Sequence, residues 1–340
     1  MKVLFAGLGG IGQRHLRNLR QIVGDVEVLA YRVRRQSGVL TDKLQIEAGA
    51  QLDERYNLRV FSDLDAALAE KPAAVFVCNP TSLHMPVALA AARAGCHLFI
   101  EKPLSHDLAE VDELVRVVEA KKLVCLVAYQ MRFHPCLRWV ASALERKAIG
   151  RVLAVRAQVG EYLPNWHTYE DYRQMYAARN DLGGGVIVTQ IHEFDYLLWL
   201  FGAPQRVFAL GGHLSSLEID VEDVASILMD CSGVPVHLHQ DYVQRPPSRT
   251  LEVIGNDGKL TLDFPSLTVQ RFGADGALAD AETFSGFERN QLFLDEMNHF
   301  LACLRGEETP VVPLRDGAKS LQIALAAKES LASGQISHLA

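Results

Sequence analysis

A glycine-rich turn between a strand and a helix, near the start of the chain, constrains the fold most. The apolar run Val3–Ala6 predicts a buried strand, and Gly7, Gly9 and Gly12 follow it in the pattern G-x-G-x-x-G, just before a helical segment. Gly7 permits a tight turn, Gly9 lets a pyrophosphate approach the backbone, and Gly12 lets the helix pack closely on the strand. The free N–H groups and the positive end of the helix would face the phosphates. The pattern therefore predicts a dinucleotide site, with a glycine-rich turn that binds nothing as the alternative.

Beyond this loop, short apolar runs alternate with helical patterns up to about residue 125. The predicted strands are 2–6, 26–31, 59–61, 74–78, 97–101 and 123–127, and the predicted helices are 11–22, 40–52, 63–70, 83–94 and 107–121. Strands that alternate with helices in this way form a parallel, doubly wound sheet. We therefore expect a dinucleotide-binding Rossmann domain at residues 1–125.

After about residue 150 the pattern changes to strands that follow one another directly. The predicted strands are 151–162, 205–213, 223–230, 234–243, 249–255, 258–263 and 267–272, and the predicted helices are 186–200, 288–304 and 315–332. Tight turns such as Asn256-Asp257-Gly258 favour antiparallel pairing. We therefore expect residues 126–340 to form a second α/β domain on a large, open, mainly antiparallel sheet. An open sheet generally needs a covering partner, which predicts a homodimer or homotetramer.

Composition narrows the class of partner. The net charge is −7 and no Lys/Arg run stands out, which argues against a nucleic-acid partner. No apolar stretch is long enough to span a bilayer, and the N-terminus enters a strand without a signal peptide. The six cysteines form no C-x-x-C pair, so we expect reduced, buried thiols in a cytoplasmic protein, without a metal site.

The end of the second predicted strand bears on the choice of cofactor. Many NAD-binding folds place an acidic residue there, where it binds the ribose 2′-hydroxyl, but this chain has Arg32. A guanidinium suits a 2′-phosphate and can stack on adenine. The sequence therefore favours NADP, with NAD as the other possibility. The alternative is that Arg32 lies in a solvent-exposed basic turn and binds no cofactor.

Two more polar clusters follow predicted strands of the parallel sheet. Asn79, Pro80 and His84 come after the fourth strand, and Glu101 and Lys102 after the fifth. Ligands of open parallel sheets bind beyond the carboxyl ends of the strands. We therefore expect these five residues to contact the cofactor; the alternatives are a surface turn at Lys102 and a helix cap at His84. The cofactor contacts expected in the glycine loop are Gly7, Gly9, Gly10, Ile11 and Gly12.

Together these motifs resemble the glucose–fructose oxidoreductase / inositol dehydrogenase / MocA (Gfo/Idh/MocA) family. The matching segments are residues 7–12, Asn79-Pro80 through His84, Ala94 to His97, Glu101-Lys102-Pro103, Arg132 to Pro135, and Gly183-Gly184-Gly185 followed by His192 and Asp195. The resemblance implies a Rossmann domain, a second domain with an open sheet, and hydride transfer between a nicotinamide and a sugar, polyol or sugar nucleotide. It implies that Lys102 and His192 are catalytic, and it makes a cis Lys102-Pro103 bond a hypothesis.

The chain departs from the family pattern at Thr189, where typical members carry Asp. This departure keeps open the reduction of an imine or of a carbonyl outside sugars. A sensor that binds dinucleotide and sugar without turnover is a further alternative, although it would not need both Lys102 and His192.

The predicted helix 186–200 places its polar residues together. At about 100° per residue, Thr189, His192, Glu193 and Tyr196 share one arc, opposite an apolar stripe. We interpret this arc as a site face, with a solvated face as the alternative, and the preceding glycines as allowing a ligand to approach the backbone. We expect His192 to accept the hydroxyl proton and Lys102 to polarise the substrate oxygen. The reverse, with Lys102 as proton carrier, remains open.

Residues 161–182 form a long irregular stretch of a kind that often binds ligands. Trp166 is suited to stacking on a sugar, and Arg179 to binding a carboxylate or phosphate. Packing on the sheet or at a subunit contact is the alternative. The expected substrate-binding residues are Trp166, Tyr172, Arg179, Thr189, His192 and Glu193.

Overall fold

A six-stranded parallel sheet forms the first half of the chain in the computed structural model, which describes residues 1–33, 38–41, 45–167 and 169–339. Its strands, in spatial order, are β5 (Arg59–Phe61), β2 (Glu27–Tyr31), β1 (Lys2–Ala6), β6 (Ala74–Val77), β7 (His97–Glu101) and β8 (Cys125–Ala128). The chain order reverses between β1 and β6, which is the point where open α/β sheets bind their ligands.

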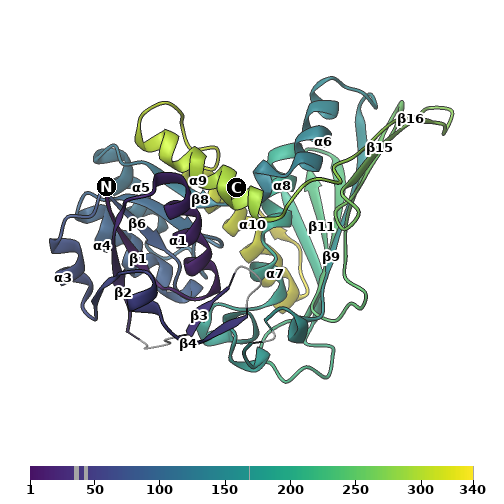
Figure 1. Ribbon diagram of the computed structural model, residues 1–340. Helices are drawn as coiled ribbons and strands as arrows, with labels where there is room; N and C mark the ends of the chain where they lie inside the picture. Colours follow the sequence, from purple (N-terminus) through teal and green to yellow (C-terminus); the bar gives the residue numbers. More distant parts are fainter. Residues whose placement is uncertain (34–37, 42–44, 168, 340) are drawn as a thin grey trace.

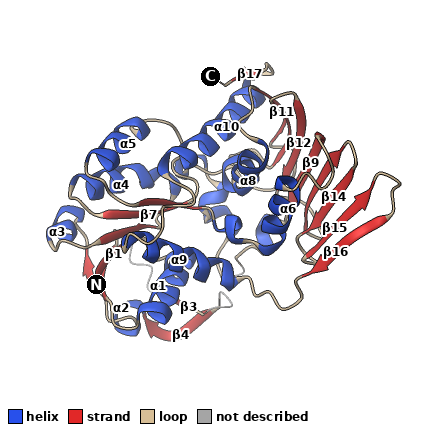
Figure 2. Ribbon diagram, turned by 90° about the horizontal axis from the view of Figure 1, so that it is seen from above, coloured by secondary structure: helices blue, strands red, loops and turns tan. Residues whose placement is uncertain are grey.

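Helices cover both faces of this sheet. Helices α4 (His84–Arg93) and α5 (Val111–Ala120) lie on one face, and α1 (Gly10–Val23) lies on the other beside α9 (Asn290–Leu304), as Figure 2 shows. The short α3 (Leu64–Ala69) follows β5. Strands covered on both sides are apolar throughout, and all four residues of β6 and of β8 are buried. The predicted doubly wound sheet is thus confirmed.

The predicted helix at 40–52 is wrong. Strands β3 (Gly38–Leu40) and β4 (Ile46–Gln51) pair as an antiparallel ribbon, which leads into the short helix α2 (Leu52–Arg55); residues 42–44 lie outside the described residues. The side chain of Gln13 donates to the carbonyl of Gly38 at 3.1 Å and accepts from the N–H of Leu40 at 2.8 Å. Gly49 has a φ of +77°, outside the helical range. Contacts with α1 therefore override the local helical pattern.

The second half is built on a nine-stranded sheet, which stands open on one side (Figure 1). In spatial order its strands are β16 (Leu278–Thr283), β15 (Thr268–Gly273), β14 (Gly258–Asp263), β13 (Ser248–Gly255), β9 (Val152–Gly160), β12 (Val234–Asp241), β11 (Val224–Cys231), β10 (Arg206–Gly212) and β17 (Ser337–His338). Within the described residues, every pair is antiparallel except β9 with β12. The predicted open, mainly antiparallel sheet is confirmed, while β16, β17 and helix α6 (Pro135–Glu145) were not predicted.

The predicted helix 186–200 is interrupted. It consists of α7 (Val186–Thr189) and α8 (His192–Phe201), with Gln190 and Ile191 between them. Side chains bind the carbonyls at this break: Lys102 donates to the carbonyl of Thr189, and Gln240 to that of Gln190. Since Thr189 and His192 belong to different helices, the single polar arc expected from the sequence does not form.

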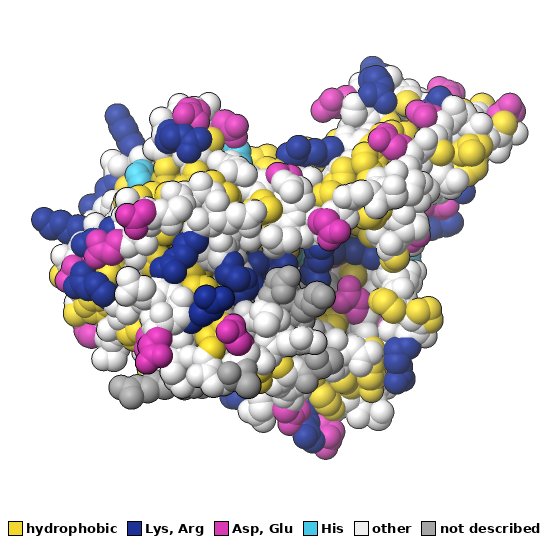
Figure 3. Space-filling model, in the orientation of Figure 1, with side chains coloured by type: hydrophobic (Ala, Val, Ile, Leu, Met, Phe, Trp, Pro, Cys, Tyr) yellow, Lys and Arg dark blue, Asp and Glu magenta, His cyan; other side chains and the backbone are white. Residues whose placement is uncertain are grey.

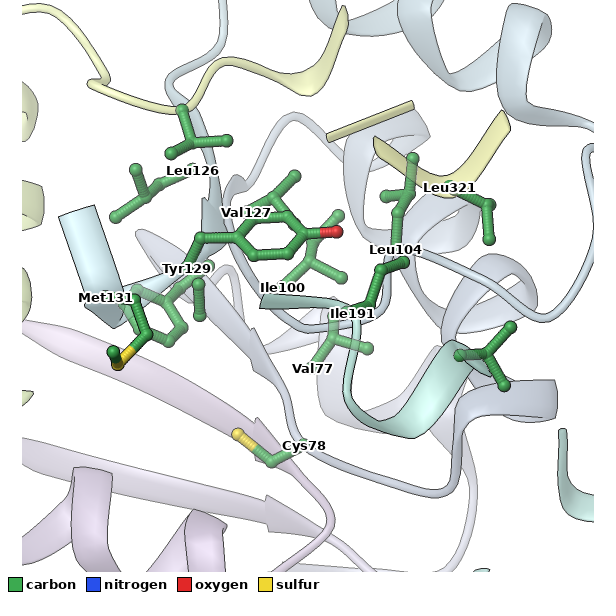
Figure 4. Close-up of a cluster of buried hydrophobic side chains, with 14 of the residues drawn as sticks. Val77, Cys78, Ile100, Leu104, Leu126, Val127, Tyr129, Met131, Ile191 and Leu321 are labelled. Carbon is green, nitrogen blue, oxygen red and sulfur yellow. The ribbon is translucent and has the colours of Figure 1, made fainter. Parts of the chain in front are cut away.

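Helix α10 (Leu314–Ser333) crosses from one sheet to the other. Gly317 packs against Val127 in β8, where a Cβ would lie 2.6 Å from the Val127 side chain. Near the other end, the hydroxyl of Ser330 accepts from the N–H of Ala209 in β10 at 3.0 Å. Between these points Leu321 belongs to the same cluster of buried apolar side chains as Ile191, Val77 and Ile100 (Figure 4), so one core joins the two halves.

All six cysteines are buried and free. None of the helices in the described residues combines the length and the apolar character needed to cross a bilayer.

Candidate active site

The three glycines of the loop between β1 and α1 are required for different reasons. Gly7 has a φ of +92°, and a Cβ there would lie 2.7 Å from the backbone N of Asn79. At Gly12 a Cβ would lie 2.4 Å from the carbonyl of Gly7. At Gly9 no atom of the described residues lies within 4 Å of a Cβ, and Gly9 is the N-cap of α1. The space at Gly9 and the first N–H groups of α1 therefore fit a pyrophosphate, as the pattern predicts.

Arg32 lies at the end of β2, next to the glycine loop. Its backbone N–H bonds to the carbonyl of Phe61, and its guanidinium lies 2.7 Å from the carboxylate of Asp53 in α2. An acidic residue thus stands at this corner of the site, contributed by a different segment from the one that sequence position suggested.

His84 connects the two loops that leave β6 and β7. Its Nδ1 lies 2.9 Å from the carbonyl of Pro103, and its Nε2 lies 2.8 Å from the carbonyl of Asn79. The ring is buried, and burial lowers its pKa. Each ring nitrogen lies within hydrogen-bond distance of a backbone carbonyl and a neutral ring donates to one of them, so this side chain orders the loops around Asn79 and Lys102. The Asn79 amide in turn donates to the carbonyl of Leu83 at 3.0 Å, and Pro80 is half-buried.

Glu101 faces the first helix. One carboxylate oxygen lies 2.6 Å from His15 Nε2 in α1, and the other accepts the backbone N–H of Lys102 at 3.1 Å. His15 is fully buried. The contact joins the glycine-loop helix to the Glu101-Lys102-Pro103 segment, and sequence reasoning missed His15. It lies three residues after Gly12, on the buried face of α1, which is the signal that was available.

Lys102 and His192 meet where α7 ends and α8 begins. The bond between Lys102 and Pro103 is cis, and Lys102 Nζ donates to the carbonyl of Thr189 at 3.0 Å. Burial, and then the charge of Lys102, lower the pKa of His192 well below its ordinary value. The structure therefore brings together the two residues expected to be catalytic, and it leaves His192 neutral at physiological pH.

The other polar residues of this segment are also buried. Glu193 lies 2.7 Å from Arg249 in β13, a partner that sequence reasoning missed, and burial raises the pKa of Glu193. Thr189 and Tyr196 are 3% and 0% exposed. Glu193 thus neutralises a cation that also lies close enough to His192 to lower the pKa of its ring.

Within residues 161–182 the structure separates the predicted substrate ligands. The ring of Trp166 meets that of Tyr242 edge-on at 5.3 Å, and the indole N–H is buried without a partner among the described residues. The Tyr172 hydroxyl accepts the N–H of Glu218, and Arg179 pairs with Asp181. Among the described residues, Trp166 is therefore the one of these three with a buried donor that lacks a partner.

The glycine run 183–185 serves contacts within the protein, in contrast to the expected approach of a ligand. A Cβ at Gly183 would lie 2.6 Å from that of His106, and one at Gly184 would lie 2.3 Å from the carbonyl of Tyr176. At Gly185, where φ is +109°, a Cβ would lie 2.2 Å from the carboxylate of Glu222. These glycines let the loop pack closely in front of α7.

Lys and Arg side chains gather in the hollow between the two halves of the molecule (Figure 3). Among the described residues, Lys102, Arg249 and Arg289 all act electrostatically on His192.

Comparison with known proteins agrees with this architecture. Residues 1–129 match a family model described as an oxidoreductase family with an NAD-binding Rossmann fold, and residues 137–261 match the GFO/IDH/MocA C-terminal domain. The chain is 27% identical to a myo-inositol 2-dehydrogenase of Thermotoga maritima, over 97% of this chain and 96% of the relative. It is 28% identical to a UDP-N-acetylglucosamine 3-dehydrogenase of Acidithiobacillus ferrooxidans, over 66% and 65% of the two chains.

Solved structures show the same fold. The WlbA dehydrogenase from Bordetella pertussis, in complex with NADH and UDP-GlcNAcA, superimposes with a TM-score of 0.81 at 22% identity, covering 100% of this chain and 99% of that one. A levoglucosan dehydrogenase in complex with NADH has a TM-score of 0.85 at 18% identity, with the same coverage. The expected family and enzyme class are thus confirmed, and the chain belongs to the Gfo/Idh/MocA family of NAD-binding oxidoreductases.

Proposed function

We propose that this protein is an NAD(P)-dependent dehydrogenase or reductase that acts on a CH–OH or carbonyl carbon of a sugar, polyol or sugar nucleotide. The meeting of Lys102 and His192 at the carboxyl edge of the parallel sheet, beside a glycine loop that fits a pyrophosphate, carries the proposal. The names of its relatives support the substrate class, since they include an inositol dehydrogenase and a sugar-nucleotide dehydrogenase.

The two side chains divide the work between them. When bound, a dinucleotide would accept or supply the hydride. Neutral His192 takes the hydroxyl proton as the substrate is oxidised, because its lowered pKa leaves a lone pair on the ring. Lys102, whose Nζ is held by the Thr189 carbonyl, orients the substrate oxygen and stabilises its developing negative charge. In reduction, the same proton returns from His192 to the oxygen.

For the cofactor we propose NADP, with NAD as the alternative. Arg32 stands at the corner where the adenine ribose of a Rossmann-bound dinucleotide lies, and its guanidinium suits a 2′-phosphate. Asp53 holds that guanidinium in place and would compete with a phosphate for it.

For the assembly we propose a homodimer or homotetramer formed through the outer face of the nine-stranded sheet. Leu210 in β10 and Leu228 in β11 are 61% and 51% exposed on that sheet, and every residue of the edge strand β16 is exposed. Covering these side chains and this strand edge would remove apolar surface and unpaired backbone from water.

The proposal is tested with Lys102→Ala and His192→Asn, in single-turnover measurements of nicotinamide absorbance. The substrates are myo-inositol, levoglucosan and UDP-GlcNAcA, each with NAD and NADP. We expect about 10²- to 10⁴-fold slower hydride transfer in both variants. Dinucleotide affinity should be retained in His192→Asn, whereas Lys102 is itself expected to contact the cofactor. Lys121→Ala, on the exposed surface after α5, is the control. Near-full turnover by His192→Asn would refute its role as base, and tight dinucleotide binding without any absorbance change in the wild type would favour a sensor.

A further inference from the structure

The turn after β8 packs against the first turn of α8 through three side chains. The ring of Tyr129 meets that of His192 edge-on, at 5.8 Å between centroids. The amide nitrogen of Gln130 lies 3.2 Å from His192 Nε2. Arg132 forms a bidentate ion pair with Asp195, with distances of 2.7 and 2.9 Å.

The Arg132–Asp195 ion pair lies next to the contacts that Tyr129 and Gln130 make with His192 and stabilises the packing of the two segments. Arg132 and Asp195 are 7% and 0% exposed, and a buried bidentate pair has a narrow choice of geometry. Gln130 lies two residues before Arg132, and His192 lies three residues before Asp195. The ion pair therefore holds the segment that carries Gln130 against the first turn of α8, which begins at His192. This matters because His192 is the first residue of α8, where the helix begins without a side-chain cap among the described residues.

A neutral imidazole has one N–H and one lone pair, and its hydrogen-bond partners decide which nitrogen carries which. His192 Nδ1 is buried without a hydrogen-bond partner among the described residues. The Gln130 amide faces the other nitrogen with its –NH₂ group, which can only donate. The lone pair is therefore on Nε2, and Nδ1 carries the hydrogen.

We propose that Gln130 is a positioning residue for His192: it selects the tautomer whose lone pair lies on Nε2, and it turns its amide when the ring is protonated. The role in turnover rests on the proposed function. The substrate hydroxyl displaces the Gln130 N–H from the Nε2 lone pair, and the hydroxyl proton adds to Nε2, since Nδ1 already carries a hydrogen. The imidazolium then has only donors, so the Gln130 carbonyl oxygen turns toward Nε2 to accept. When the proton leaves, the amide returns.

An amide suits both the neutral and the protonated His192 ring, because rotation about a single bond presents either its N–H donor or its carbonyl acceptor. In Gln130→Glu a carboxylate can only accept, so it would hold a hydrogen on Nε2 and favour the imidazolium. In Gln130→Met the chain length is kept but both polar groups are lost. The two variants therefore have different effects on the tautomer and protonation of the ring. If Gln130 only supported the fold, the two variants would change the ring in the same way.

The first test needs no substrate. Protein with ¹⁵N-labelled histidine is titrated by NMR, and the His192 signals are identified by their loss in His192→Asn. We expect the Nδ1–H tautomer in the wild type, a change to Nε2–H or imidazolium with a pKa higher by about one unit or more in Gln130→Glu, and mixed tautomers in Gln130→Met. Gln158→Met is the matched control, since Gln158 in β9 donates to Gln244 in the connection between β12 and β13, away from His192. An Nε2–H tautomer in the wild type, or shifts unchanged in both variants, would overturn the proposal.

The second test is kinetic. We expect Gln130→Met to lower the hydride-transfer rate about 10- to 100-fold with KM for the dinucleotide unchanged. We expect the acid limb of the pH profile to move to higher pH in Gln130→Glu. A profile that stays in place would refute the role in turnover. If the wild type transfers no hydride but the NMR titration behaves as described, the proposed function fails and the tautomer assignment stands.

Discussion

His15 in the first helix and Glu101 at the end of β7 share a hydrogen bond of 2.6 Å, although 86 residues separate them in the chain. The bond ties the helix that faces the dinucleotide phosphates to the residue directly before Lys102. We expect His15→Leu to leave the buried Glu101 carboxylate without this partner and to destabilise the protein by about 1–3 kcal/mol in denaturant unfolding.

The control for this variant is His338→Leu at the exposed C-terminal strand β17. Glu101→Gln completes a double-mutant cycle, which isolates the pair from other losses. If the two single effects simply add in the double variant, the contact contributes nothing of its own.

Alanine substitutions at Gly9 and Gly12 are expected to affect different properties: the first lowers dinucleotide affinity, and the second lowers the free energy of unfolding. Gly9→Ala adds a Cβ in open space at a φ of −69°, so the free energy of unfolding should stay within about 0.5 kcal/mol of the wild type. The same Cβ intrudes on a pyrophosphate, and dinucleotide affinity should fall about tenfold or more. Gly12→Ala instead overlaps the Gly7 carbonyl and should cost about 1–3 kcal/mol of stability. Isothermal titration with NAD and NADP measures the first effect; an unchanged affinity of Gly9→Ala would mean that the phosphates bind elsewhere.

Arg32 and Asp53 are expected to control the choice between NADP and NAD. Arg32→Ala removes a charge-assisted hydrogen bond to a 2′-phosphate, which is worth about 1.5–3 kcal/mol, and should weaken NADP binding much more than NAD binding. Asp53→Asn removes the carboxylate that competes for the guanidinium and should strengthen NADP binding. Equal losses for both dinucleotides in Arg32→Ala would exclude this assignment.

Glu296 in α9 should give the stability a specific pH dependence. It is 1% exposed, neither carboxylate oxygen has a hydrogen-bond partner among the described residues, and burial, then Glu101 and Asp195, raise its pKa well above the usual range. The unfolded chain releases this proton above about pH 4.3, while the native state keeps it. The wild type therefore loses stability relative to Glu296→Gln as the pH rises from about 4.3 toward the native pKa. Guanidinium unfolding at several pH values checks this, and a difference that does not vary with pH would contradict it.

The parts of the fold set by local pattern were predictable. The strands of the parallel sheet match the predicted runs to within a few residues, because most of them are buried on both faces and therefore apolar, whereas the edge strand β5 is partly exposed. Predictions failed where distant contacts decide the conformation, as at the ribbon β3–β4 held by Gln13 and at the break after Thr189. Strand β16 was missed because all of its side chains are exposed and it therefore shows no apolar alternation.

For the candidate site, motifs placed Lys102 and His192, but their partners come from distant segments. His15 and Arg249 carry no local signal of the residues that they contact. Gln130 is different, since it lies just after a predicted strand of the parallel sheet. The rule that led to Asn79 and Lys102, namely polar residues at the carboxyl edge, applies to it equally.

Helix α10 has a consequence for motion. It is anchored at Gly317 to the parallel sheet and at Ser330 to the open sheet, and its 20 residues span about 30 Å. Because both ends of the helix are fixed, a rotation that moves the two sheets apart would break the packed contacts at Gly317 or at Ser330. We therefore expect the separation of the two sheets to change little during turnover, with movement confined to side chains and loops.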